Sequence, residues 1–184
     1  MSDEIKSYSK VAVLYGGSSS EREISLITGK AVFKSLKSEG VEVILIDTIE
    51  PFIEVLKTER VTHAWIALHG SDGEDGKIQS ILNMLNIKYT GSDPITCSIT
   101  MNKYFTKSIL KSSGFKTPEF MVLNSSTQYE NIIKELKEPF VLKQCSEGSS
   151  IGIYIVESRE EYLDHFSEIE KSNDWIIAEQ FMQG

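Results

Sequence analysis

The sequence has few of the residues that mark metal-binding or disulfide-rich proteins. Its two cysteines are Cys97 and Cys145, and neither belongs to a Cys-x-x-Cys pair or a Cys/His cluster. The spacing that structural zinc sites require is therefore missing. One disulfide between the two cysteines stays open, but nothing else in the sequence indicates an oxidising compartment.

Long apolar stretches and basic runs are missing as well. No segment approaches the ~18 apolar residues that span a bilayer, and the polar start, MSDEIKSYSK, lacks the apolar core of a signal peptide. The 19 lysines and arginines form no run, and 27 acidic residues give a net charge of −8. Nucleic-acid-binding proteins usually have a basic patch or stripe instead. We expect a cytoplasmic protein that binds neither membranes nor nucleic acids.

Strand-like and helix-like patterns alternate through the first half of the chain. Ser20 and Glu23 have the spacing of a capping box, and Gly40 is placed to end the helix that follows. Alternation of this kind is typical of a parallel sheet with helices on both faces, joined by right-handed crossovers. The predicted strands are residues 11–15, 41–46, 61–68 and 87–89, and the predicted helices are residues 20–40, 51–58 and 76–86.

The second half of the chain predicts a smaller α+β domain. Residues 91–94 are the best candidate for a boundary, which divides the chain into residues 1–94 and residues 95–184. Ser158 and Glu161 repeat the capping-box spacing. The predicted helices are residues 102–113, 127–136 and 158–170, and the predicted strands are residues 119–123, 140–143, 151–156 and 175–178.

Two glycine-containing clusters follow predicted strands of the first domain. The first is YGGSSSERE, residues 15–23, and the second is LHGSDGEDG, residues 68–76. Parallel α/β sheets bind ligands beyond the carboxyl ends of their strands, and a helix N-terminus attracts anions. From local physics alone, a capped turn and an acidic, solvated turn remain open alternatives.

Two further clusters lie in the second domain. Lys143 ends an apolar strand, where its ammonium must reach water or an anion. The loop that follows, residues 147–150, offers hydroxyls and backbone N–H groups as a phosphate flap, although it is not the glycine-rich loop ending in Gly-Lys-Ser/Thr. A hairpin with a polar turn is the open alternative. The last cluster, residues 179–182, could read an adenine edge through its backbone groups.

In their order and spacing, these clusters resemble the motifs of the D-alanine–D-alanine ligase family, within the ATP-grasp superfamily. The resemblance implies a pre-ATP-grasp N-terminal domain followed by the small ATP-grasp subdomain. It also implies an ATP-dependent enzyme that joins two D-alanines through an acylphosphate to make a peptidoglycan precursor. The similar segments are VAVLYGGSSSEREISLITGKAV, ALHGSDGEDGKIQSILNMLNIKYTGSD, MNKYFTKSILKSSGFKTPEF, VLKQCSEGSSIGI and EQFMQG.

The resemblance implies a role for each matching residue. Glu21 would hold the ammonium of the first D-alanine, and His69 would face the same substrate. Ser149 matches the serine that orients the Glu21 side of the substrate site. Glu21 and Ser149 are therefore the expected catalytic residues. The remaining matches, together with Ser149, are expected to bind ATP. Lys103 and Lys143 would grip the phosphates, Glu147, Ser149 and Ser150 belong to the flap, and Glu179, Gln180 and Met182 match the segment that holds adenine.

Two departures from the family pattern stand out. Gln144 occupies a position where the family usually has proline, which loosens the entry to the flap. The family also continues into a third region that supplies magnesium ligands, a transition-state arginine and a closing loop. The resemblance implies ATP and Mg²⁺ as cofactors and a homodimer through the N-terminal domain. Without the third region, we expect no metal ligand in this chain and no dipeptide synthesis by these residues alone.

Two alternatives stay open. One is a relative that joins D-alanine to D-lactate or D-serine, because the residues that select the second substrate lie mostly in the third region. The other is a non-catalytic, nucleotide-binding remnant.

Overall fold

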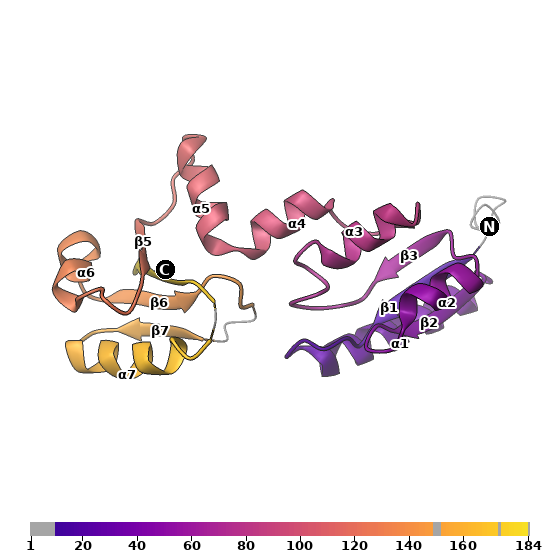
Figure 1. Cartoon of the computed structure of the whole chain (residues 1–184), viewed down its shortest axis with the longest axis horizontal. Coiled ribbons are helices and arrows are strands. Elements are labelled where there is room, and N and C mark those ends of the chain that lie inside the picture. The colour runs from indigo at the N-terminus through magenta and orange to yellow at the C-terminus, as the bar shows by residue number, and fades with distance from the viewer. Residues whose placement is uncertain (1–9, 149–151, 173, 184) are drawn as a thin grey trace. The chain divides into compact units, whose positions relative to one another are not determined.

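The computed structural model describes residues 10–148, 152–172 and 174–183. They form two compact units, one ending at Ser98 and one beginning at Ile99 (Figure 1). The domain limits predicted from the sequence, residues 1–94 and 95–184, stay a prediction. No helix within the described ranges is both long and apolar enough to cross a membrane.

Unit 1 is built on a four-stranded parallel sheet with the strand order β2-β1-β3-β4. The central strand β1 pairs Val11 with Val43 on one side and with His63 on the other. The predicted parallel sheet is thus confirmed, with β2 and β3 shorter than the apolar runs that contain them. The strands are β1 (Val11–Tyr15), β2 (Val43–Asp47), β3 (His63–Ile66) and β4 (Lys88–Tyr89).

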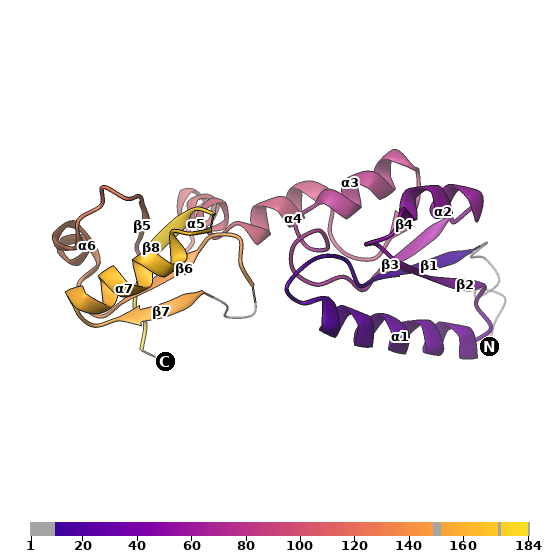
Figure 2. The same cartoon turned by 60° about the horizontal axis from the view of Figure 1, so that its bottom comes forward.

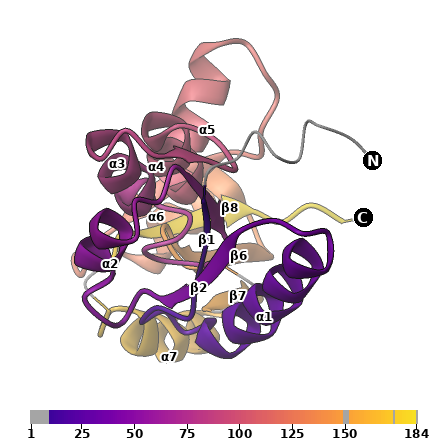
Figure 3. The ribbon, with the colours of Figure 1, turned by 90° about the vertical axis from the view of Figure 1, so that its right-hand side faces the viewer.

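Helices cover both faces of this sheet, as the alternation predicts. Ala12 and Leu14 of β1 share one core with Leu56 of α2 and Leu82 of α3. On the other face α1 packs closely, since a Cβ on Gly29 would lie 2.4 Å from the Tyr15 Cβ. Figures 2 and 3 show α1 on one side of the sheet and α2 on the other. These helices are α1 (Arg22–Ser38), α2 (Phe52–Thr58) and α3 (Lys77–Met84), and the next helix, α4 (Pro94–Met101), includes the division between the units.

The two ends of α1 differ in how well local sequence predicts them. The predicted cap at Ser20 is wrong: the helix begins at Arg22, and the N-cap residue Glu21 makes no side-chain capping bond. The predicted end at Gly40 is confirmed. Gly40 has φ +79°, its N–H donates to the Lys37 carbonyl, and the next N–H donates to the Leu36 carbonyl, the pairing of a Schellman motif.

Helix α4 is absent from the sequence prediction. The Asp93 carboxylate caps it by accepting the N–H groups of Ile95 and Thr96 at 3.0 and 3.1 Å. Pro94 occupies the first helical turn, where a missing N–H costs nothing. The Asp-Pro pair was an available signal, but the Ile, Thr, Cys and Ser residues that follow are weak helix formers.

Unit 2 is an α+β unit with an antiparallel sheet in the order β5-β8-β6-β7. The predicted cap of α7 is confirmed, because the Ser158 hydroxyl accepts the Glu161 N–H at 3.3 Å. Ile151, the predicted start of β7, lies outside the described residues. The elements are α5 (Lys103–Ser112), β5 (Phe120–Leu123), α6 (Tyr129–Leu136), β6 (Phe140–Gln144), β7 (Ile153–Val156), α7 (Arg159–Ile169) and β8 (Ile176–Gln180).

One face of this sheet carries the core of unit 2. Phe140, Leu142 and Ala178 are fully buried there against Ile132 of α6 and Tyr162 of α7. Both cysteines are buried, and no disulfide joins Cys97 to Cys145. The disulfide that the sequence left open is therefore not formed.

Candidate functional site

Three loops meet at the carboxyl edge of the unit 1 sheet, where parallel sheets bind ligands. They follow β1, β2 and β3. The Ser18 hydroxyl donates to the Asp72 carboxylate at 2.9 Å, and the Ser19 hydroxyl donates to the His69 carbonyl at 2.7 Å. These bonds join the two glycine-containing clusters that the sequence singles out.

An ion pair fixes the loop after β1. Arg22 donates to both carboxylate oxygens of Asp47, at 3.0 and 2.6 Å, and to the Gly17 carbonyl at 2.8 Å. The Asp47 carboxylate also accepts the Gly17 N–H at 3.2 Å. The hydrogen bond from Arg22 lowers the pKa of Asp47 to about 2, helped by the N–H groups of Ile49 and Gly17. The turn is therefore held from two sides.

Glu21 and His69 belong to this loop assembly. The Glu21 N–H donates to the same Ser19 hydroxyl that bonds the His69 carbonyl. A Cβ on Gly70 would lie 2.8 Å from Glu21 Oε2, and Gly70 has φ +69°. Only glycine allows both this close approach and this backbone conformation without strain. The Glu21 carboxylate thus lies against the residue that follows His69.

The His69 ring is positioned by Thr28 and Glu74. Its Nε2 lies 3.2 Å from the Thr28 hydroxyl, and its Nδ1 lies 3.8 Å from a Glu74 carboxylate oxygen. The Thr28 hydroxyl donates to the Ile24 carbonyl at 3.0 Å. Its proton is therefore in use, so the hydroxyl oxygen accepts a proton that we assign to Nε2.

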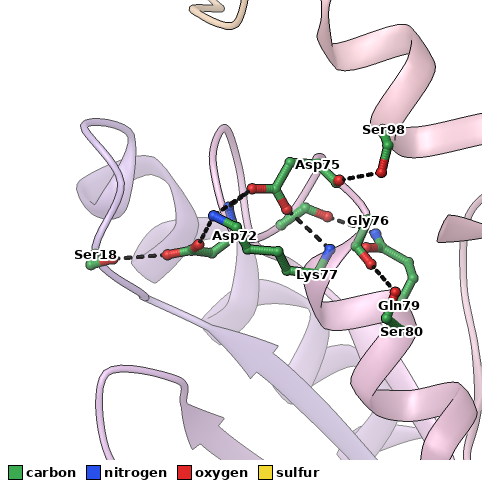
Figure 4. Close-up of polar contacts among 9 residues, drawn as sticks. Ser18, Asp72, Asp75, Gly76, Lys77, Gln79, Ser80 and Ser98 are labelled. Carbon is green, nitrogen blue, oxygen red and sulfur yellow. Dashed lines mark hydrogen bonds and ion pairs between the residues drawn. The ribbon is translucent and has the colours of Figure 1, made fainter. Parts of the chain in front are cut away.

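The rest of the loop after β3 is tied together by an ion cluster (Figure 4). Lys77, at the start of α3, pairs with Asp72 and Asp75, each at 2.9 Å. Hydrogen bonds to these two carboxylates raise the pKa of Lys77 above its usual range. The Ser98 hydroxyl of α4 donates to the Asp75 carbonyl at 2.7 Å. The acidic loop is thus held by internal ion pairs, while the side chains of Asp72, Glu74 and Lys77 stay 43%, 52% and 65% exposed.

In unit 2, Lys103 lies at the start of α5 and contacts Cys145, the residue directly after β6. Its backbone N–H donates to the Cys145 carbonyl at 2.9 Å, and its Nζ donates to the same carbonyl at 3.3 Å and to the Glu147 carbonyl. Burial lowers the pKa of Lys103, and the charge of Lys143 lowers it further. The two ammonium groups are close enough to repel each other.

Lys143 shares a carboxylate with a second lysine. Its Nζ lies 3.0 Å from Glu179 Oε2, and the Nζ of Lys107 lies 2.9 Å from the same oxygen. The side chains of all three are largely buried, with 16%, 14% and 9% of Lys143, Glu179 and Lys107 exposed. Two ammonium groups therefore share one carboxylate here, which suits an anionic ligand. Lys103 has the Asp174 and Glu147 carboxylates as acidic neighbours.

The other residues expected to bind ATP are placed less closely together. The Gln180 N–H donates to the Glu119 carbonyl at 2.8 Å within the sheet. Met182 follows β8 and is 62% exposed. Ser149 and Ser150 lie outside the described residues. Among the residues that are described, no group of three or more His, Cys, Asp and Glu side chains could hold a metal ion.

Comparison with known proteins places the chain in a family. Residues 10–54 and 49–92 match the model for the D-ala D-ala ligase N-terminus, and residues 109–184 match the model for the D-ala D-ala ligase C-terminus. This chain belongs to the D-alanine–D-alanine ligase family. The structure likewise confirms the predicted combination of a parallel sheet with an α+β unit.

Individual family members agree with this placement. The D-alanine–D-alanine ligase of Pseudomonas entomophila is 39% identical over 181 residues, which cover 98% of this chain and 57% of that one. The ligase of Nitrosospira multiformis is 40% identical over 177 residues, which cover 96% and 58%. The chain therefore spans somewhat more than half the length of these relatives.

Solved structures of family members have the same fold. The ligase from Bacillus anthracis has a TM-score of 0.86 at 31% identity, covering 95% of this chain and 58% of that one. A second structure of the Bacillus anthracis ligase, complexed with ATP, has a TM-score of 0.83 at 29% identity and covers 95% and 59%.

Sequence reasoning missed Lys107, Thr28 and Asp47. Lys107 contacts the candidate site residue Glu179, and Thr28 contacts His69. Asp47 contacts Arg22 and Gly17 of the first cluster. Lys107 follows Lys103 by four residues and so lies on the same side of α5, which was a usable signal. Asp47 ends a parallel strand beside Tyr15, which was a second signal. No local pattern distinguishes Thr28 from other polar residues of α1.

Proposed function

We propose that this chain provides the D-alanine-binding and ATP-binding parts of a D-alanine–D-alanine ligase. The observation that carries the proposal is the pair of buried ammonium groups, Lys107 and Lys143, that share one carboxylate in unit 2 of a chain of this family. Lys103 and Lys143 lie near each other, and one carboxylate, Glu179, serves both Lys143 and Lys107. The phosphates of ATP are the ligand that would offset this charge.

In this proposal Glu21 of unit 1 holds the ammonium of the first D-alanine. Its carboxylate lies against Gly70, and its N–H donates to Ser19, whose hydroxyl bonds the His69 carbonyl. His69, oriented through Thr28, faces the same substrate. The first D-alanine and ATP are held and oriented by charge. ATP then transfers a phosphoryl group to the D-alanine carboxylate and leaves as ADP, and the amine of the second D-alanine attacks the acylphosphate and displaces phosphate.

Three finer features belong to the proposal. Mg²⁺ would neutralise the reacting phosphates, and we assign it no ligand among the described residues. The protein would act in the cytoplasm, where peptidoglycan precursors are made, and would form a homodimer through its N-terminal domain. Sedimentation of the purified chain tests the dimer directly.

The phosphate role of Lys143 is tested by Lys143→Ala. Loss of one charge-assisted contact costs about 1.5–3 kcal/mol, so we expect ATP to bind about 10- to 100-fold more weakly in an NMR titration of backbone amides. Lys111→Ala is the matched control, because Lys111 is exposed and paired with Glu119. ATP affinity within twofold of the unmodified chain would make Lys143 structural.

The substrate role of Glu21 is tested by Glu21→Gln. We expect D-alanine to bind at least about tenfold more weakly while ATP affinity is unchanged. The melting temperature should barely move, because an acid in the first turn of a helix contributes only about 0.3–1 kcal/mol. Glu23→Gln is the control, because Glu23 is an acid two residues further on, in the first turn of the same helix. Equal D-alanine affinities in the two variants would remove Glu21 from the substrate site.

A further inference from the structure

The Glu179 carboxylate has two lysine partners on one oxygen, and only one of them has a role in the proposed function. Lys143 is proposed to hold a phosphate, whereas Lys107 has none. We propose that Lys107 is a positioning residue: it remains on Glu179, so that Lys143 can leave that carboxylate and bind the phosphates of ATP. This inference rests on the proposed function of unit 2.

The surroundings of the two lysines differ in a way that suits these roles. Lys107 Nζ donates to the Thr117 hydroxyl at 2.6 Å, pairs with Glu179 at 2.9 Å and lies 5.1 Å from the centre of the Phe120 ring. Three groups thus fix its ammonium. The Lys143 ammonium has one such contact with the described residues, the 3.0 Å ion pair with Glu179. Lys143 is therefore the partner that can be exchanged.

Electrostatics gives Lys107 two effects on that exchange. A buried carboxylate without a counter-ion is costly, and Lys107 keeps Glu179 paired when Lys143 moves away. Lys107 also repels Lys143 across the shared oxygen, which weakens the hold of Glu179 on Lys143. Without Lys107, Glu179 would retain Lys143, and a phosphate would have to compete with a buried ion pair.

The test compares ATP with adenosine, which has no phosphate, in NMR titrations of the whole chain. We expect Lys107→Met to weaken ATP binding about tenfold and to leave adenosine within twofold. Lys107→Arg keeps the charge and should keep the ATP affinity within about threefold. When Glu179 is already changed to Gln, a further Lys107→Met should have no effect on ATP, because no carboxylate remains to retain Lys143.

Each other result has a defined meaning. Equal weakening of ATP and adenosine would mean that Lys107 only supports the fold, and unchanged ATP binding would overturn the inference alone. Absence of ATP binding by the unmodified chain would overturn the proposed function itself. If Lys107→Met does not fold, the Glu179→Gln variant is measured instead. This change releases Lys143, so the preference for ATP over adenosine must rise. A constant preference contradicts the inference.

Discussion

At the scale of single residues, the Arg22–Asp47 pair decides how the first cluster is shaped. It ties the start of α1 to the end of β2 and holds the Gly17 carbonyl and N–H between them. The same contacts explain why the capping box predicted at Ser20 does not form. The Ser19 hydroxyl bonds the loop after β3 and Arg22 bonds the end of β2, and these tertiary bonds outweigh the local preference.

This pair gives the protein a defined pH response. The pKa of Asp47 is about 2 in the folded chain, below the ordinary value near 3.9. Its stabilising contribution is therefore complete above about pH 4 and is lost as the pH falls toward 2. Because the pair is partly exposed, we expect a contribution of about 1 kcal/mol or less.

Asp47→Asn removes this contribution. In a Trp175→Phe background Trp65 is the remaining tryptophan, so its fluorescence reports urea unfolding of unit 1. We expect the Trp175→Phe chain to lose more unfolding free energy between pH 5 and pH 2.5 than the same chain with Asp47→Asn. Asp164→Asn in this background should behave like the Trp175→Phe chain alone. Parallel pH curves with and without Asp47→Asn would contradict the assignment.

At the scale of elements, the sequence predicts what local contacts decide and misses what long-range contacts decide. The Ser158 cap of α7 forms as the spacing indicates, whereas the same spacing at Ser20 does not produce a cap. Likewise Lys143 could be selected from its place at a strand end, and Lys103 from the family resemblance. Their relation to Lys107 could not, because it depends on α5 lying beside the end of β8.

Helix α4 offers a direct test of capping. Replacing Asp93 by Ala removes the acceptor for two N–H groups, which costs about 1 kcal/mol. We expect amide hydrogen exchange of residues 95–100 to become about fivefold faster, while α7 exchanges as before. Asp93→Asn keeps the cap and serves as the control. Identical exchange in the Ala and Asn variants would mean that packing, rather than the cap, holds α4.

At the scale of the whole molecule, the two units have different chemistry. The carboxyl edge of unit 1 gathers carboxylates around His69, which suits an amino acid ammonium. In unit 2, Lys107 and Lys143 share the Glu179 carboxylate, which suits phosphates. Composition could not reveal this division, since the net charge of −8 averages over both units. The family order of the motifs did indicate it.

The most direct test of this division is an NMR titration of the unmodified chain with ATP and, separately, with D-alanine. ATP should shift the amide signals of Lys103, Cys145 and Glu179, and D-alanine should shift those of Glu21 and Gly70. The method detects dissociation constants of about 1 mM, a binding free energy near −4 kcal/mol. Shifts by both ligands in the same unit, or by neither ligand in these residues, would contradict the proposed function.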